Sequence, residues 1–276
     1  MAHNKNMNEN QTIILTDPAR EIAELFTALQ SGDGALAGSK YLATKFEVDA
    51  WSQEFYRIVS TIMDRLTALN KIIADLPIDK DYQSEMVDHV DEIAEAFTAK
   101  SFQSAWNAFG ADKISAKNLQ PIKGLSGLVR QKIVYRKLSE EEILDLVEMI
   151  DDLVNWLKEH QISQQDFIRQ ALIEGFENLR FRLTKLNWLG WGYALDSLRE
   201  VITAYMLLER KSSPLQDNPD ADAILLKIKN AIKSIYKKVE TVKSVSETGD
   251  WLLKAYGAAT LAQQALPPIT GFLPNG

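Results

Sequence analysis

The sequence contains no cysteine among its 276 residues. This absence excludes disulfide bonds, thiolate metal sites and cysteine nucleophiles. Histidine is scarce, with only His3, His89 and His160, and no Gly-x-Ser-x-Gly motif is present to position a serine nucleophile. A glycine-rich phosphate-binding loop is also missing, so no nucleotide or other cofactor is predicted.

Long apolar runs are also missing, since no stretch of about 18 consecutive apolar residues occurs. The nearest approach, residues 251–273, is interrupted by Lys254 and by the pair Pro267–Pro268, and we expect it to dock on the rest of the chain. Residues 1–16 lack the apolar core and cleavage site of an export signal, and their polar start predicts a mobile leader. We therefore expect a cytoplasmic protein.

Helical periodicity dominates what the sequence does contain. Apolar residues make up 46% and charged residues 25%, which is typical of a chain that folds on its own. The apolar positions of residues 47–76 are spaced three or four apart, and a second helical pattern begins near Asp79. We predict an all-α fold of about eight helices, with these two forming a long N-terminal antiparallel hairpin.

Helix-capping patterns and changes in composition suggest the organisation of the chain. Asp17–Pro18 and the capping box of Ser139 and Glu142 each predict a helix start. Between them, residues 111–138 carry proline, glycine and a weak helical signal. We predict a helical region over 17–110, a basic linker over 111–138 and a helical bundle with an apolar tail over 139–276, with one continuous domain as the alternative.

The net charge of −7 is unevenly distributed. Residues 1–110 and 139–211 are acidic, whereas 111–138 is basic and 212–276 is close to neutral. This alternation favours charge pairing within the molecule and disfavours nucleic acid as a partner. The alternative is contact with an anionic surface such as a membrane. The residues predicted for that contact are Lys123, Arg130, Lys132, Arg136, Lys137, Lys233 and Lys237.

The acidic group Asp151, Asp152 and Asn155 is a candidate for metal binding. It bears a passing likeness to the aspartate-rich motif by which helical isoprenoid enzymes hold magnesium-bound diphosphate, a chemistry that requires several carboxylates converging from facing helices. No second motif of this kind occurs. We favour the interpretation that these residues form the solvated side of an amphipathic helix.

Aromatic and basic residues gather over residues 180–193. Arg180, Arg182, Trp188 and Trp191 have the composition of an interface hot spot and are our candidate partner-binding residues. The alternative is that the aromatic side chains fill a junction between helices while the arginines extend to solvent.

These patterns favour a non-enzymatic interaction or assembly protein, because long helices with regular apolar faces offer contact surfaces. We expect a protein partner or self-association. The alternatives are a membrane-contacting protein that uses its basic C-terminal helix and apolar tail, and a metal-dependent helical enzyme that uses Asp151 and Asp152.

Overall fold

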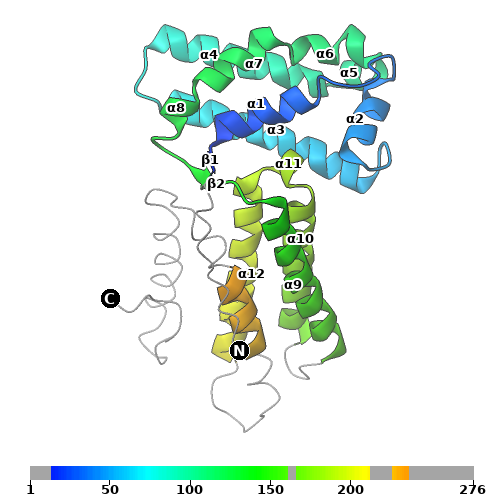
Figure 1. Cartoon of the computed structure of the whole chain (residues 1–276), viewed down its shortest axis with the longest axis vertical. Coiled ribbons are helices and arrows are strands. Elements are labelled where there is room, and N and C mark those ends of the chain that lie inside the picture. Colours follow the sequence, from blue (N-terminus) through cyan, green and yellow to red (C-terminus); the bar gives the residue numbers. More distant parts are fainter. Residues whose placement is uncertain (1–13, 161–165, 212–225, 236–276) are drawn as a thin grey trace, which may run out of the picture.

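The computed structural model describes residues 14–160, 166–211 and 226–235, and helices dominate these ranges (Figure 1). The all-α class is therefore confirmed. The described residues form more and shorter helices than the eight expected, and the long hairpin stays a prediction. In this part of the chain, no helix is both long enough and apolar enough to span a membrane.

The elements of the N-terminal half are mostly short. They are β1 (Leu15–Thr16), α1 (Pro18–Ala28), α2 (Gly38–Phe46), α3 (Gln53–Ala74), α4 (Lys80–Ala94), η1 (Glu95–Phe97), α5 (Ala99–Gln103), η2 (Trp106–Ala108), α6 (Gly110–Lys113), α7 (Ala116–Gly124), α8 (Ser126–Val129) and β2 (Tyr135–Arg136). The C-terminal half has longer helices. They are α9 (Glu140–Glu159), α10 (Asp166–Thr184), the short α11 (Leu186–Leu189), α12 (Trp191–Lys211) and residues 226–235.

Side-chain caps fix several helix starts. Asp17 Oδ1 accepts a hydrogen bond from the backbone N–H of Arg20 at 3.0 Å, and Pro18 follows as the first helical residue. Ser139 and Glu142 form a reciprocal capping box, and Asp79 caps α4. All three of these predicted helix starts are confirmed.

The start of α3 differs from the prediction. The helix begins at Gln53, where Ser52 Oγ accepts a hydrogen bond from the N–H of Phe55, and not at Glu47. Glu47 instead ends α2 in a left-handed conformation, and Trp51 is left-handed as well. The apolar spacing was misleading because it continues through this non-helical connection.

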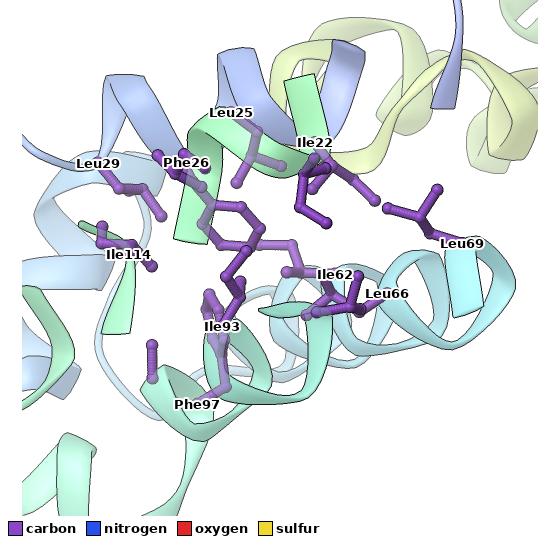
Figure 2. Packing of buried hydrophobic residues seen from close by; sticks show 14 of the residues in the cluster. Ile22, Leu25, Phe26, Leu29, Ile62, Leu66, Leu69, Ile93, Phe97 and Ile114 are labelled. Atoms are coloured by element: carbon purple, nitrogen blue, oxygen red, sulfur yellow. The ribbon is translucent and has the colours of Figure 1, made fainter. Parts of the chain in front are cut away.

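Helices α1 to α8 surround one core. Phe26 of α1 lies at its centre, between Ile22 and Leu29 of the same helix and residues of α3 and α4 (Figure 2). Buried residues from the predicted linker belong to this core, and they are Ile114, Leu119, Ile122, Leu125 and Val129. The weak helical signal of 111–138 was therefore misleading, because most of that segment forms short helices that pack on α1 and α4.

A second core is formed by α9, α10, α12 and residues 226–235. These helices run along the long axis of the molecule, whereas α1 to α8 lie across one end of it (Figure 1). The two cores meet at α11 and the start of α12, where Leu189 is buried against the first core and Trp191 against the second. The antiparallel pair β1–β2 adds a second connection, in which Leu15 is paired with Arg136 and Thr16 with Tyr135. The division into domains stays a prediction.

The corner between α11 and α12 depends on Gly190. Its backbone has φ +80° and ψ 160°, a conformation that is essentially restricted to glycine. A Cβ atom at this position would lie 2.6 Å from the guanidinium carbon of Arg65. The close approach of α3 to this corner thus requires a residue without a side chain.

We predict that Gly190→Ala lowers the free energy of unfolding by about 2 kcal/mol or more, because backbone strain adds to the displacement of Arg65. Gly127→Ala is the matched control, since no atom lies within 4 Å of the added Cβ. It should leave stability unchanged or raise it by up to about 1 kcal/mol. Urea unfolding of both variants measures the difference, and equal effects would contradict the role of Gly190.

Candidate functional site

A groove of about 710 Å³ lies where the two cores meet. Its lining comes from β1, α1, α3 and the start of α9, together with the end of α10, α11 and the start of α12. The apolar residues of its lining are Leu25, Ala28, Leu138, Ile143, Leu144, Val147, Leu183, Leu186, Trp188 and Trp191. The groove is therefore largely apolar and open to solvent.

A pair of buried charges, Glu21 of α1 and Arg65 of α3, also lines the groove. The side chains are only 16% and 8% exposed, and Arg65 Nη2 lies 3.2 Å from Glu21 Oε2. Arg65 Nη1 donates to the carbonyl of Trp188 at 2.6 Å, and the backbone N–H of Trp191 donates to Glu21 at 3.3 Å. The pair thus joins two helices of the first core to the end of α11 and the start of α12.

Burial has the largest effect on the pKa values of both side chains in this pair. It raises the pKa of Glu21 above its ordinary value of 4.5, although Arg65 and the N–H of Trp191 act in the opposite direction. Burial also lowers the pKa of Arg65, against the attraction of Glu21. Because the folded-state pKa of Glu21 is raised, its contribution to stability is fully present below about pH 4.5, where the carboxyl is protonated, and is lost as the pH rises through the folded-state pKa. The pair therefore fixes the relative position of the helices that it joins more than it stabilises the folded protein.

Two buried polar atoms of the groove lining lack a hydrogen-bond partner among the described residues. They are the indole Nε1 of Trp191 and the hydroxyl of Thr16. A buried indole N–H without an acceptor costs about 1 to 3 kcal/mol.

The mouth of the groove combines an exposed leucine with charges of both signs. Leu144 of α9 is 68% exposed, although leucine is usually buried. Lys137 Nζ lies 3.0 Å from Glu24 Oε2, and Glu140 is also part of the lining. Neither sign of charge dominates, so the groove is not built for a strongly charged ligand.

The predicted partner-binding residues fall into two places. Trp188 and Trp191 both line the groove, but Trp191 is only 3% exposed and belongs to the second core. Arg182 donates to the carbonyl of Tyr193, and Arg180 Nε lies 3.0 Å from Asp151. The structure therefore does not bring the four residues together as one exposed patch. The burial of Trp191 fits the alternative in which aromatic side chains fill a junction between helices.

The candidate metal ligands all lie on α9. Asp151 is paired with Arg180, and Asp152 and Asn155 are exposed. In the described part of the chain, no group of three or more histidine, aspartate or glutamate residues could hold a metal ion.

Several basic residues predicted to contact an anionic surface are paired within the molecule instead. Arg130 Nε lies 2.9 Å from the fully buried Asp17, and Lys137 is paired with Glu24. Lys123, Lys132 and Lys233 are exposed. For Arg136 only the backbone in β2 is described, and Lys237 lies outside the described residues, as does the 251–273 segment.

Asn118 of α7 organises a further contact between the basic segment and acidic α4. Its Nδ2 donates to Glu92 at 3.0 Å and to the carbonyl of Lys113, so its Oδ1 is left to accept from His89 Nδ1 at 3.0 Å. Hydrogen bonding from Asn118, together with Lys117, lowers the pKa of Glu92 below 4.5.

Sequence reasoning missed Glu21 and Arg65. A signal was present for Arg65, which lies three residues after Ile62 and four before Leu69, within the apolar stripe of α3. A charge at such a position predicts a buried partner. The identity of that partner depends on the folding of α1 against α3, which local spacing does not encode.

We predict that Arg65→Met lowers the free energy of unfolding by about 2 to 4 kcal/mol at neutral pH, because it leaves Glu21 buried without a cation. The loss should shrink toward about pH 4.5, since protonated Glu21 carries no charge. Adding Glu21→Gln should remove this pH dependence, whereas Glu24→Gln alone, at a half-exposed site, should cost less than about 1 kcal/mol. Urea unfolding at several pH values tests this, and a pH-independent loss in Arg65→Met would contradict it.

We also predict that Asn118→Ala raises the pKa of Glu92 toward 4.5, because the carboxylate loses its first hydrogen-bond donor. Lys117→Gln should produce a smaller rise, since Lys117 Nζ lies 3.7 Å from Glu92. Carbon-13 NMR titration of the glutamate carboxyl groups measures both shifts. An unchanged pKa in Asn118→Ala would show that the amide does not hold this carboxylate.

The groove is the described site that combines apolar walls, an exposed leucine and unpartnered buried donors. Its function has to be inferred from these properties. Comparison of the chain with protein-family models, curated proteins and solved structures finds no match in any of the three.

Proposed function

We propose that this protein is a non-enzymatic interaction or assembly protein that binds an apolar segment of a protein partner in the groove between its two cores. The observation that carries this proposal is the apolar wall of α9, which ends in an exposed Leu144 at the mouth. Burial of a leucine side chain contributes about 1.5 to 3 kcal/mol. A partner that covers it gains that free energy.

The shape of the surface favours a polypeptide over a small molecule. A small ligand within the 710 Å³ groove would cover only the part of the Leu144 side chain that lines it. A peptide can fill the groove with one side chain and cover Leu144 with another. Apolar anchors of this kind are how peptide segments commonly bind to grooves.

The charges around the groove favour the same occupant. The charges at the mouth, Glu24, Lys137 and Glu140, are of both signs. They suit the polar rim of a protein interface better than a phosphate or a lipid headgroup.

The test begins with peptides selected on the wild-type protein from a displayed library. Leu144→Glu should weaken the selected peptides by about tenfold or more, since the contact with Leu144 is replaced by a charge. Leu36→Glu is the matched control, because Leu36 is also an exposed leucine but does not line the groove. It should leave the affinity unchanged.

A second measurement locates the bound peptide. The indole N–H resonance of Trp191, assigned with Trp191→Phe, should shift when the peptide binds. The proposal would be contradicted by peptides that bind Leu144→Glu with the same affinity as the wild-type protein, or by peptides that do not shift this resonance. Light scattering separates self-association, since a dimer that Leu144→Glu dissociates would identify a second copy as the partner.

A further inference from the structure

The connection between α2 and α3 holds a tryptophan in an unfavourable conformation. Trp51 has φ +65°, in the left-handed region that costs a residue with a side chain about 1 to 2 kcal/mol. Both ends of the connection are fixed, because Phe46 and Phe55 are fully buried and Ser52 caps α3. The fold therefore maintains Trp51 in this position against a local cost.

The ring of Trp51 is half exposed and rests on buried aromatic residues. It is 48% exposed, and its centroid lies 5.8 Å from those of Phe55 and Phe102, both of which are buried. Tyr56 lies beside it at 6.0 Å and is 54% exposed. The two exposed rings thus have rigid support beneath them and are preorganised for contact.

The charges around these rings are mostly negative. Glu47, Asp49 and Glu54 are all exposed, and neither Asp49 nor Glu54 forms an ion pair with any described residue. Arg57 is the one cation in residues 47–57, and it is held by other partners. Its guanidinium lies over the ring of Phe181 at 4.3 Å and donates to Asn178 at 2.8 Å, and the charge of Glu54 acts on it without an ion pair between them.

Aromatic faces beside carboxylates attract cations. A guanidinium or ammonium group over an indole ring gains about 0.5 to 2 kcal/mol, and a carboxylate adds a charge-assisted hydrogen bond. An anionic partner would be repelled, and a purely apolar one would desolvate the carboxylates without compensation. The chemistry of the patch therefore fits a basic group.

We propose that Trp51, Tyr56, Asp49 and Glu54 form a second contact surface, which binds a basic segment of a protein partner with an arginine or lysine side chain over the ring of Trp51. This surface is separate from the groove, since none of its four residues lines it. The proposal does not depend on what the groove binds.

Fluorescence anisotropy with a labelled peptide of alternating arginine and glycine tests the proposal. We expect saturable binding to the wild-type protein, and Trp51→Asn should weaken it about tenfold or more. Asparagine tolerates the left-handed conformation, so the backbone is preserved. The variant Asp49→Asn/Glu54→Gln changes only exposed side chains and should weaken binding and reduce its dependence on salt.

Tyr82→Ala is the matched control, because Tyr82 is another exposed aromatic residue close to acids, Asp79 and Asp81, but on the regular helix α4. It should bind the peptide as wild type does. A peptide with glutamate in place of arginine should not bind.

Three results would overturn the proposal. One is that Trp51→Asn and Asp49→Asn/Glu54→Gln bind the arginine peptide with the same affinity as the wild-type protein. Another is an equal loss in Tyr82→Ala, which would indicate general attraction to an acidic protein. The third is a dimer that dissociates in Trp51→Asn without peptide, which would assign the surface to a second copy of the chain.

Discussion

One carboxylate and one guanidinium, buried side by side, fix where the second core sits on the first. Glu21 and Arg65 come from α1 and α3, and they bind the backbone N–H of Trp191 and the carbonyl of Trp188. A shift of the second core would leave two buried charges and two backbone groups unpaired, at a cost of several kcal/mol. The pair adds little net stability because burial opposes the ionisation of both members, so its main effect is to exclude other arrangements.

The groove follows from this arrangement. The contacts between the cores include α11, the two short strands, Arg57, which contacts Asn178 and Phe181 of α10, and Lys185, whose Nζ donates to the carbonyl of Phe46 at 2.9 Å. Helix α9 reaches the junction only with its first turns, where Leu144 faces the open side of the groove and is left uncovered. The same constraint that positions the second core thus leaves part of its apolar surface available for contact.

Local chemistry explains which parts of this fold the sequence predicts. Caps such as Asp17 and Ser139 depend on residues a few positions apart, and these were read correctly. The sequence does not reveal the α2–α3 connection, because Val48 and Trp51 keep a helical spacing, while Ser52 already caps the next helix. The groove brings residues of α1, α3 and α9 together through tertiary packing, and no spacing within one segment encodes that. Of the four predicted partner-binding residues, Trp188 and Trp191 line the groove, although Trp191 is nearly covered by the second core.

The two proposed contact surfaces rest on one buried aromatic cluster. Trp51 packs on Phe55, Phe55 lies 6.1 Å from Phe46, and Phe46 contacts the groove residue Trp188 at 5.1 Å. Contiguity of this kind does not by itself transmit binding from one surface to the other. It does fix their separation, since close-packed rings do not deform readily. A partner that carries both an apolar and a basic segment can therefore bind both surfaces at once only if the distance between its two segments matches the distance between the surfaces. This geometric condition is a source of specificity that neither surface has alone.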